Sequence, residues 1–543
     1  MANRSRRRLS WQSRVGVAVV PLGLLGLAAS GCSDRTDATT GGPSATASLA
    51  PTPPEQPPPQ LTQDQVKNAV SRLDGLVENA MRQTGVPGIA VAVVYQDKVV
   101  YRKGFGVREL GKSAKVDPST VFQLASVSKP LASTVVAGAV GRKAIGWNDP
   151  VRPHEPDLAF KDPYVSANAT VADLFSHRTG LPDHAGDLLQ DLGYPLDYIL
   201  QHLRLEPLTP FRASYAYTNY GLTAAGEAVA DAAKTSWPQL ATTTLFEPLG
   251  MDHSSYRRAD YDKAADKASA HVLVDGHWKP STTENADRQA PAGGASSTID
   301  DLAKWMRLQM NNGTFEGKKV IDSAALDETR VPHAVSGPPR APAGEPGFYG
   351  LGWNVSYDQR GRLRLSHSGG FALGAATEVD MLPGERLGVV ALTNGQPIGV
   401  PEAINAAFLD IAQNGKQTVD WLPFFRKIVT ATIYAAASPT NYAKPPGNAT
   451  PAKPDDAYTG TYANDYYGPV TVSGDGKGNL SMTLGPKKMT FPLKHYTGDT
   501  FSYQTQGENA VGLSGVTFHT SSGRATSITI EHLNESGLGT FTR

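Results

Sequence analysis

The chain carries the stretch F-Q-L-A-S-V-S-K at residues 122–129, and the interpretation of the whole sequence starts there. Ser126 and Lys129 form the pattern S-x-x-K, and a segment from Ser128 into Val140 predicts a helix. A spacing of three residues puts the hydroxyl and the ammonium on one helical face. A serine becomes a nucleophile when a base takes its proton, and a lysine is such a base when desolvation or nearby cations lower its pKa. The start of a helix also offers backbone N–H groups to a developing oxyanion.

A second short pattern, Y-x-N, occurs at Tyr217-Thr218-Asn219 and again at Tyr462-Ala463-Asn464. A phenol can pass a proton between nucleophile and leaving group if cationic neighbours such as Lys129 depress its pKa. The amide of Asn219 could orient Lys129 and the acyl amide of a substrate. The alternative interpretation is a loop tyrosine that packs on a helix.

A third pattern, His367-Ser368-Gly369-Gly370, follows residues of a predicted strand around Leu365. An imidazole at this point can donate a hydrogen bond to a substrate, and the glycines allow a substrate backbone to approach closely. A single His-x-Gly is unspecific, since most such histidines are ordinary surface or core residues.

The order and spacing of the three patterns resemble the active-site motifs of the serine penicillin-recognising enzymes. The resemblance covers residues 61–415 and is to the class C β-lactamase/esterase branch. It is strengthened by the stretches Phe122–Lys129, His177–Pro182, Glu247–Met251, Pro291–Gly294 and Tyr349–Trp353. The C-terminal region, which opens with Tyr458-Thr459-Gly460-Thr461-Tyr462, resembles the lipocalin-like domain that follows such hydrolases in some peptidases.

The resemblance implies a role for each site residue. Ser126 would be acylated, Lys129 and Tyr217 would manage its proton, and no cofactor or metal is expected. The amides of Ser126 and Gly370 would form the oxyanion hole, and the substrate would contact Asn219, His367 and Gly369. The β-lactamases of the family carry Lys-Thr-Gly where this chain has His367-Ser368-Gly369. A lysine is a fixed cation suited to a carboxylate, whereas a histidine is largely neutral at pH 7 and would gain charge only towards pH ~6.5.

The element pattern predicts an α+β fold. An apolar strand at residues 88–94 pairs with a second one near residues 99–101, a helical insertion follows, and strands return at residues 362–365 and 387–392. Residues 66–81 have helical periodicity and predict one amphipathic helix. A Pro-rich break at residues 437–454 precedes short β-type runs, which predict a small all-β barrel. Together with the resemblance, this pattern implies a β-lactamase/transpeptidase-like antiparallel sheet with a helical lobe at 61–415, a helix and linker at 416–454, and a barrel at 455–543.

The N-terminal region predicts export and lipid anchoring. Residues 1–32 contain a basic segment, an apolar run and then Leu27-Ala28-Ala29-Ser30-Gly31-Cys32, which resembles a bacterial lipobox. The basic segment fits a twin-arginine signal or an ordinary export signal equally well. Alternatives are a short membrane anchor and an incidental cysteine. Residues 33–60 are rich in Thr, Ser, Ala and Pro and predict a disordered tether.

The charge balance and the motifs that do not occur argue against several classes of function. The 51 basic residues equal the 51 acidic ones, which argues against a nucleic-acid binder. No G-x-S-x-G, H-E-x-x-H or Walker pattern occurs. The leading hypothesis is a serine hydrolase of the cell envelope that acts on small esters, amides or D-amino-acid peptides. The alternatives are a β-lactamase or DD-carboxypeptidase proper, and a non-hydrolytic penicillin-binding lipoprotein. The sequence does not indicate the oligomeric state.

Overall fold

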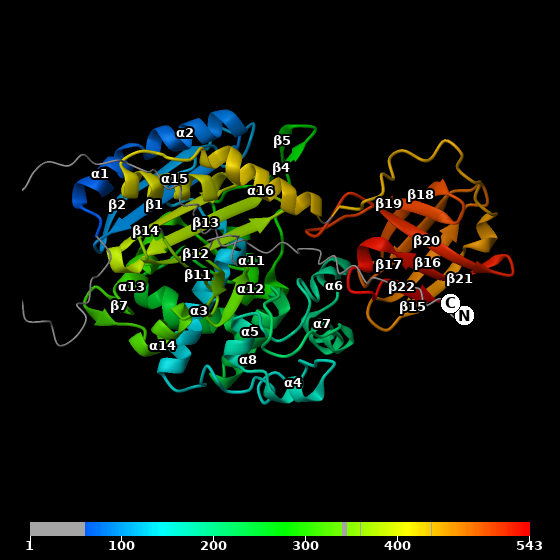
Figure 1. The fold of residues 1–543 in the computed structure, drawn as a ribbon, viewed down its shortest axis with the longest axis horizontal. Coiled ribbons are helices and arrows are strands. Elements are labelled where there is room, and N and C mark those ends of the chain that lie inside the picture. The colour runs from blue at the N-terminus through cyan, green and yellow to red at the C-terminus, as the bar shows by residue number, and fades with distance from the viewer. Residues whose placement is uncertain (1–59, 339–344, 359, 436) are drawn as a thin grey trace, which may run out of the picture.

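The computed structural model describes residues 60–338, 345–358, 360–435 and 437–543 (Figure 1). The predicted export signal, Cys32 and most of the predicted tether lie outside these residues. Within the described part of the chain, no helix is both long and apolar enough to cross a membrane.

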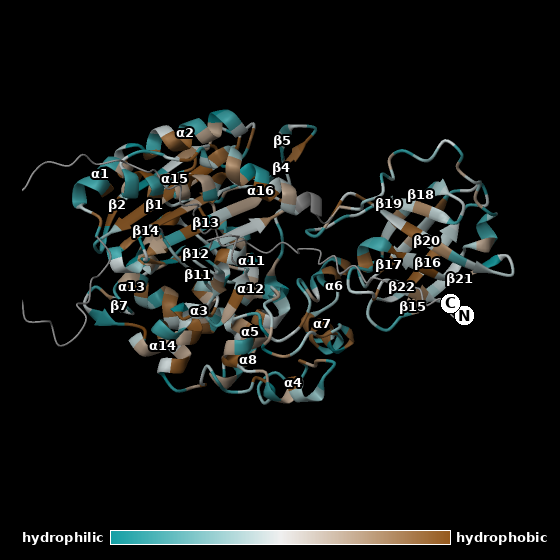
Figure 2. Cartoon of the chain, in the orientation of Figure 1, coloured by the Kyte–Doolittle hydropathy of each residue, from teal (hydrophilic) through white to brown (hydrophobic). Residues whose placement is uncertain are grey.

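The first domain is built on an eight-stranded antiparallel sheet, as Figure 1 shows. Its strands lie in the spatial order β2 (Lys98–Gly106), β1 (Gly88–Tyr95), β14 (Leu387–Thr393), β13 (Ala375–Leu382), β12 (Leu363–Phe371), β11 (Asn354–Tyr357), β10 (Gly347–Tyr349) and β9 (Ala334–Gly337). The central strands β1, β13 and β14 are buried along their whole length. Strands β1 and β14 are largely hydrophobic on both faces (Figure 2), whereas β13 also buries Thr377, Glu378 and Asp380. The N-terminal strand pair therefore joins a group of strands that lies more than 200 residues further along the chain.

Helices cover both faces of this sheet (Figure 1). One face packs against α1 (Gln63–Ser71), α2 (Leu73–Thr84), α15 (Val400–Asn414) and α16 (Trp421–Ala435). The other face packs against a helical lobe, in which the longest helices are α3 (Ser128–Gly141), α8 (Asn219–Ala232) and α13 (Ile299–Met310). The expected α+β fold with a helical lobe is confirmed.

The helical lobe also contains many short elements. Its shorter helices are α4 (Pro163–Asn168), α5 (Val171–Phe175), α6 (Asp187–Leu192), α7 (Leu196–His202), α9 (Trp237–Ala241), α10 (Glu247–Leu249), α11 (Arg258–Lys263), α12 (Ala290–Gly293) and α14 (Ser323–Asp327). The domain also contains three two-stranded pairs: β3 (Phe122–Gln123) with β6 (Ser296–Ser297), β4 (His271–Val274) with β5 (His277–Pro280), and β7 (Thr314–Phe315) with β8 (Lys318–Lys319).

The prediction of one helix over residues 66–81 is wrong in one respect. The segment forms two helices, α1 and α2, which are separated at Arg72. Both helices keep their apolar residues on the sheet side, because Val66, Leu73 and Val77 are all buried. Helical periodicity predicts which face is buried, but it is nearly unchanged when a single residue interrupts the helix.

The C-terminal domain is a closed antiparallel barrel of eight strands. They are β15 (Gly460–Asn464), β16 (Gly468–Gly474), β17 (Leu480–Leu484), β18 (Met489–Thr497), β19 (Thr500–Gln504), β20 (Leu513–Ser521), β21 (Arg524–Ile530) and β22 (Thr540–Thr542). Large side chains that alternate along the strands are buried, among them Tyr462, Met482, Phe518 and Phe541. Side chains therefore fill the interior, as the size of an eight-stranded barrel allows. The predicted all-β barrel is confirmed.

The barrel is docked on the helical lobe. The hydroxyl of Tyr194 donates to the carbonyl oxygen of Tyr467 at 2.7 Å, and that of Tyr198 donates to the carbonyl oxygen of Tyr466 at 3.1 Å. The rings of Tyr194 and Tyr198 stack with centroids 4.0 Å apart. These contacts bring the barrel next to α6, which lies at the candidate site described below.

Candidate active site

Ser126 lies in a short 3-10 turn, Ala125–Val127, that leads directly into α3. The preceding residue, Ala125, has a φ of 46°, a left-handed conformation that costs a non-glycine residue about 1 kcal/mol. This sharp turn places the serine between the strand β3 and the helix, with its side chain only partly buried. Ser126 is therefore reachable from solvent, although its neighbours Ala125 and Val127 are fully buried.

Lys129 is completely buried beneath Ser126. Its Nζ lies 3.1 Å from Ser126 Oγ, 2.8 Å from Asn219 Oδ1 and 2.9 Å from the carbonyl oxygen of Ala292. Burial lowers the pKa of Lys129 to about 7, although the charge of Asp187 acts in the opposite direction. A lysine with this pKa is substantially neutral at physiological pH, which a general base requires.

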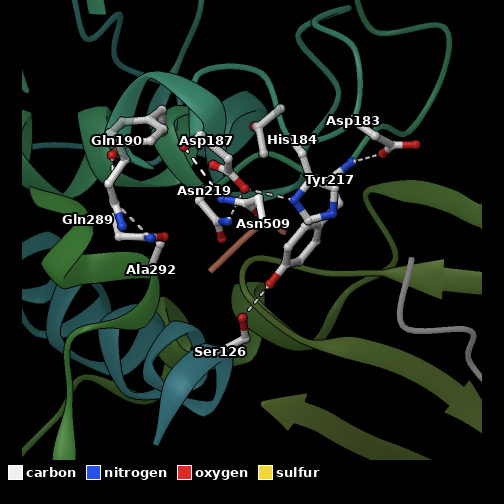
Figure 3. Close-up of polar contacts among 12 residues, drawn as sticks. Ser126, Asp183, His184, Asp187, Gln190, Tyr217, Asn219, Gln289, Ala292 and Asn509 are labelled. Carbon is white, nitrogen blue, oxygen red and sulfur yellow. Dashed lines mark hydrogen bonds and ion pairs between the residues drawn. The ribbon is translucent and has the colours of Figure 1, made fainter. Parts of the chain in front are cut away.

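Tyr217 contacts the same serine (Figure 3). Its hydroxyl donates to Ser126 Oγ at 2.8 Å, and Lys129 Nζ lies 4.5 Å from the centre of its ring. Cationic neighbours do not depress the pKa of this phenol, because burial raises it above its ordinary value. Tyr217 is thus a protonated hydroxyl and a hydrogen-bond donor in the resting site.

Asn219 connects Lys129 to a buried carboxylate. Its Oδ1 accepts from Lys129, and its Nδ2 donates to Asp187 Oδ2 at 2.8 Å. The same carboxylate oxygen lies 2.8 Å from His184 Nδ1. Both ends of the amide are therefore engaged within the protein. The structure supports the part of the prediction in which Asn219 orients Lys129, and the predicted contact of Asn219 with a substrate stays a prediction.

His367 lies behind the site and is fully buried. Its Nδ1 is 2.7 Å from the carbonyl oxygen of Ser368, so this nitrogen carries the proton, and its Nε2 is 2.9 Å from the hydroxyl of Tyr349. Burial and the nearby charge of Lys129 lower the pKa of His367 to about 3. The expectation that this imidazole gains charge near pH 6.5 is therefore wrong. Both ring nitrogens have partners within the protein, so the ring does not point a free N–H at a substrate.

Strand β12 lies close against the turn that carries Ser126. A Cβ at Gly369 would lie only 2.9 Å from the backbone nitrogen of Ser126, so glycine allows this approach. The next residue, Gly370, is exposed. The oxyanion hole that the resemblance implies, formed by the amides of Ser126 and Gly370, stays a prediction.

The sequence did not indicate several residues that contribute to the site. Asp187 and His184 belong to no recognised pattern, and the carbonyl of Ala292 is a backbone group. The sequence pointed to the stretches His177–Pro182 and Tyr349–Trp353, but it did not indicate the contacts that they make in the site. His177 packs 4.7 Å from the ring of Tyr217 and accepts a hydrogen bond from Thr218 N, and Tyr349 holds His367.

The second Y-x-N pattern has a structural role. Tyr462 lies on β15 inside the barrel, where its hydroxyl donates to the carbonyl oxygen of Tyr458. It is one of the barrel's fully buried residues. Of the two matches, only the one at Tyr217 contacts Ser126.

The relatives of this chain include hydrolases. Unguisins hydrolase ungD of Aspergillus violaceofuscus is 26% identical over 481 residues, which cover 80% of this chain and 83% of the relative. Protein flp of Staphylococcus aureus is 23% identical over 344 residues, 61% of this chain and 64% of the relative. Among solved structures, the octameric penicillin-binding protein homologue from Pyrococcus abyssi is similar in fold, with a TM-score of 0.56 at 20% identity, over 85% of this chain and 98% of that one.

The family models divide the chain where the fold does. Residues 444–538, which include most of the barrel, match the domain of unknown function DUF3471. Residues 73–414 match the Beta-lactamase family, and this segment contains Ser126, Lys129, Tyr217 and His367. The protein therefore belongs to the Beta-lactamase family.

Proposed function

We propose that this protein is a hydrolase that forms an acyl-enzyme on Ser126 with small, uncharged esters, amides or D-amino-acid peptides. One observation carries the proposal: Ser126 Oγ lies within hydrogen-bond distance of both a buried lysine with a pKa of about 7 and a protonated tyrosine. A base and an acid beside one nucleophile are the groups that acyl transfer requires.

In the acylation step, Lys129 takes the proton of Ser126 as Oγ attacks the substrate carbonyl carbon and the C–O bond forms. The amides of Ser126 and Gly370 stabilise the negative oxygen. When the bond to the leaving atom breaks, Tyr217 gives that atom a proton and regains one from Lys129, which becomes neutral again. Water then repeats the sequence on the acyl-enzyme, with its proton going to Lys129, and Ser126 is released with a carboxylic acid.

The surroundings of β12 favour uncharged substrates. His367 is neutral, so the third motif supplies no fixed cation for a substrate carboxylate. Penicillins and free peptide carboxylates are therefore poorer candidates than neutral esters and amides. The name of the related unguisins hydrolases also supports hydrolysis as the reaction.

The variant Ser126→Ala tests the mechanism. We expect hydrolysis of a neutral nitrophenyl ester to fall at least about 10⁴-fold and fluorophosphonate labelling to disappear, with a nearly unchanged melting temperature. Ser133→Thr is a matched control. Ser133 lies on α3 below the site, and among the contacts described its hydroxyl bonds only to the backbone of Leu351. Turnover retained in Ser126→Ala would refute the assignment of the nucleophile.

The proposed location is the outer face of the cell membrane, with a lipid on Cys32 as the anchor. The support is the lipobox-like sequence followed by a stretch rich in Pro and Thr. Two acyl chains attach a protein stably, whereas one chain is marginal. Cys32→Ala should move the protein from the membrane fraction to the soluble fraction without changing its activity on a soluble ester. Unmutated protein that is soluble and has no lipid by mass spectrometry would contradict this proposal.

A further inference from the structure

The loop between β19 and β20, residues 505–512, reaches from the barrel to the candidate active site. Glu508 Oε1 accepts from Ala372 N at 2.5 Å, and its Oε2 accepts from Leu373 N at 3.2 Å. These two amides form the turn directly after β12, two and three residues beyond Gly370. The barrel thus holds the end of the strand that supplies the proposed oxyanion hole.

The next residue of the loop holds the other side of the site. Asn509 donates to Asp191 Oδ2 through its backbone N at 3.0 Å and through its Nδ2 at 3.2 Å. Asp191 is on α6, one turn beyond Asp187, which holds Asn219 and through it Lys129. Figure 3 shows Asn509 beside Asp187 and Asn219. One loop of the barrel therefore bridges the lysine side and the oxyanion side of the site.

The contact is closely packed. Gly507 has a φ of 103°, and a Cβ on it would lie 2.7 Å from the carboxylate of Asp191, so only glycine fits there. Behind the loop, between α6 and the barrel, remains a cavity of about 20 Å³, room for about one water. Burial and the neighbouring carboxylates of Glu284 and Asp191 raise the pKa of Glu508, which its two amide partners counteract. The backbone amides of Ala372 and Leu373 compensate for the burial of the Glu508 carboxyl group, so this contact depends on both of them.

The position of the loop indicates which part of a substrate would lie nearest to it. The leaving atom must lie near the hydroxyl of Tyr217, whose ring is 6.4 Å from that of His367, towards the start of β12. In the proposed mechanism the acyl group would extend from the other side of the reacting carbon, and the turn at Ala372 lies beyond the end of β12. The loop from the barrel occupies that end.

We propose that the β19–β20 loop closes the acyl side of the site, so that the enzyme transfers short acyl groups and excludes long ones. This inference rests on the proposed function. It gives the barrel a role in substrate selection, because the residues that limit the acyl group belong to the barrel and not to the catalytic domain.

The test compares acyl chains of different length on the full-length protein. The substrates are nitrophenyl acetate and nitrophenyl octanoate, and the variants are Glu508→Ala and Glu508→Gln. The control is Asp475→Ala, since Asp475 is also a barrel carboxylate that accepts from two backbone amides, but within its own turn. Labelling rates with ethyl and octyl fluorophosphonates provide a second readout that needs no turnover.

We expect the unmutated enzyme to prefer acetate. In Glu508→Ala the ratio of kcat/KM for octanoate over acetate should rise at least about tenfold, mainly through a lower KM for octanoate, and Glu508→Gln should give a smaller rise. The control should keep the original ratio. A ratio that stays the same in both Glu508 variants, or an unmutated enzyme that accepts octanoate as well as acetate, would overturn the inference. A Ser126 that no fluorophosphonate labels would instead refute the proposed function.

Discussion

The variant Asp187→Asn gives a direct measure of how the site sets the basicity of Lys129. The carboxylate of Asp187 is joined to Lys129 Nζ by two hydrogen bonds of 2.8 Å with the amide of Asn219 between them. Its negative charge favours the ammonium form and therefore raises the pKa of Lys129 against the effect of burial. Asparagine has nearly the same shape and removes the charge, so the pKa of Lys129 should fall.

The size of this change follows from the distance. The two hydrogen bonds and the amide between them place the Asp187 carboxylate about 7 Å from the Lys129 ammonium. At an effective dielectric constant of about 20, the attraction between these two charges is about 2 kcal/mol. One pKa unit corresponds to 1.36 kcal/mol, so the pKa should fall by about 1–2 units. Lys129 acts as a base only when neutral, and its activity is lost as the pH falls through its pKa of about 7. The acid limb of the pH profile should therefore move to lower pH by the same amount.

The assay is kcat/KM against pH for a neutral short-chain ester whose product absorbs equally across the range, because this quantity reports the pKa values of the free enzyme. Asp197→Asn is the control, since it makes the same charge change at an exposed position on the nearby helix α7, where solvent screens it. An acid limb that stays in place in Asp187→Asn, or that moves to higher pH, would refute the role assigned to Lys129.

Two further predictions concern Tyr217 and His367. Tyr217→Phe keeps the ring below Lys129 but removes the donor to Ser126, so kcat should fall by about 10²–10⁴-fold with little change in melting temperature; a kcat close to that of the unmutated enzyme would show that another group delivers the proton. The ratio of efficiencies, penicillin over neutral ester, should not respond to His367 between about pH 5.5 and 8, because its pKa of about 3 lies below that range. A ratio that rises towards pH 5.5 in the unmutated enzyme, but not in His367→Gln, would contradict the buried, neutral imidazole.

The proximity of the proposed nucleophile and its proposed base could be predicted from the sequence because their geometry is local. Ser126 and Lys129 are three residues apart on a turn that continues into a helix, so their spacing alone brings the side chains together. The strands β1 and β14 could be predicted for a similar reason, since continuous apolar runs are typical of buried strands. The fold class followed from the order of these elements.

The protonation states could not be predicted, because they depend on burial by distant parts of the chain. Tyr217 appeared to be a phenol beside a cation, but its pKa is raised by a desolvation that only the packed structure shows. The same applies to His367, which Tyr349 and the sheet enclose. The contacts of Glu508 with residues 372 and 373 join segments that are 135 residues apart, and no local pattern indicates such a pair.

The three neighbours of Lys129 explain how one arrangement serves both of its protonation states. A neutral amine has two N–H groups and one lone pair. Asn219 Oδ1 and the carbonyl oxygen of Ala292 are acceptors only, so they take the two N–H groups, and the lone pair is left for the hydroxyl of Ser126 at 3.1 Å. After proton transfer, the ammonium has three N–H groups, and the same three oxygens accept them. Because no side chain must move when the proton does, the site is prepared for the step before the substrate arrives.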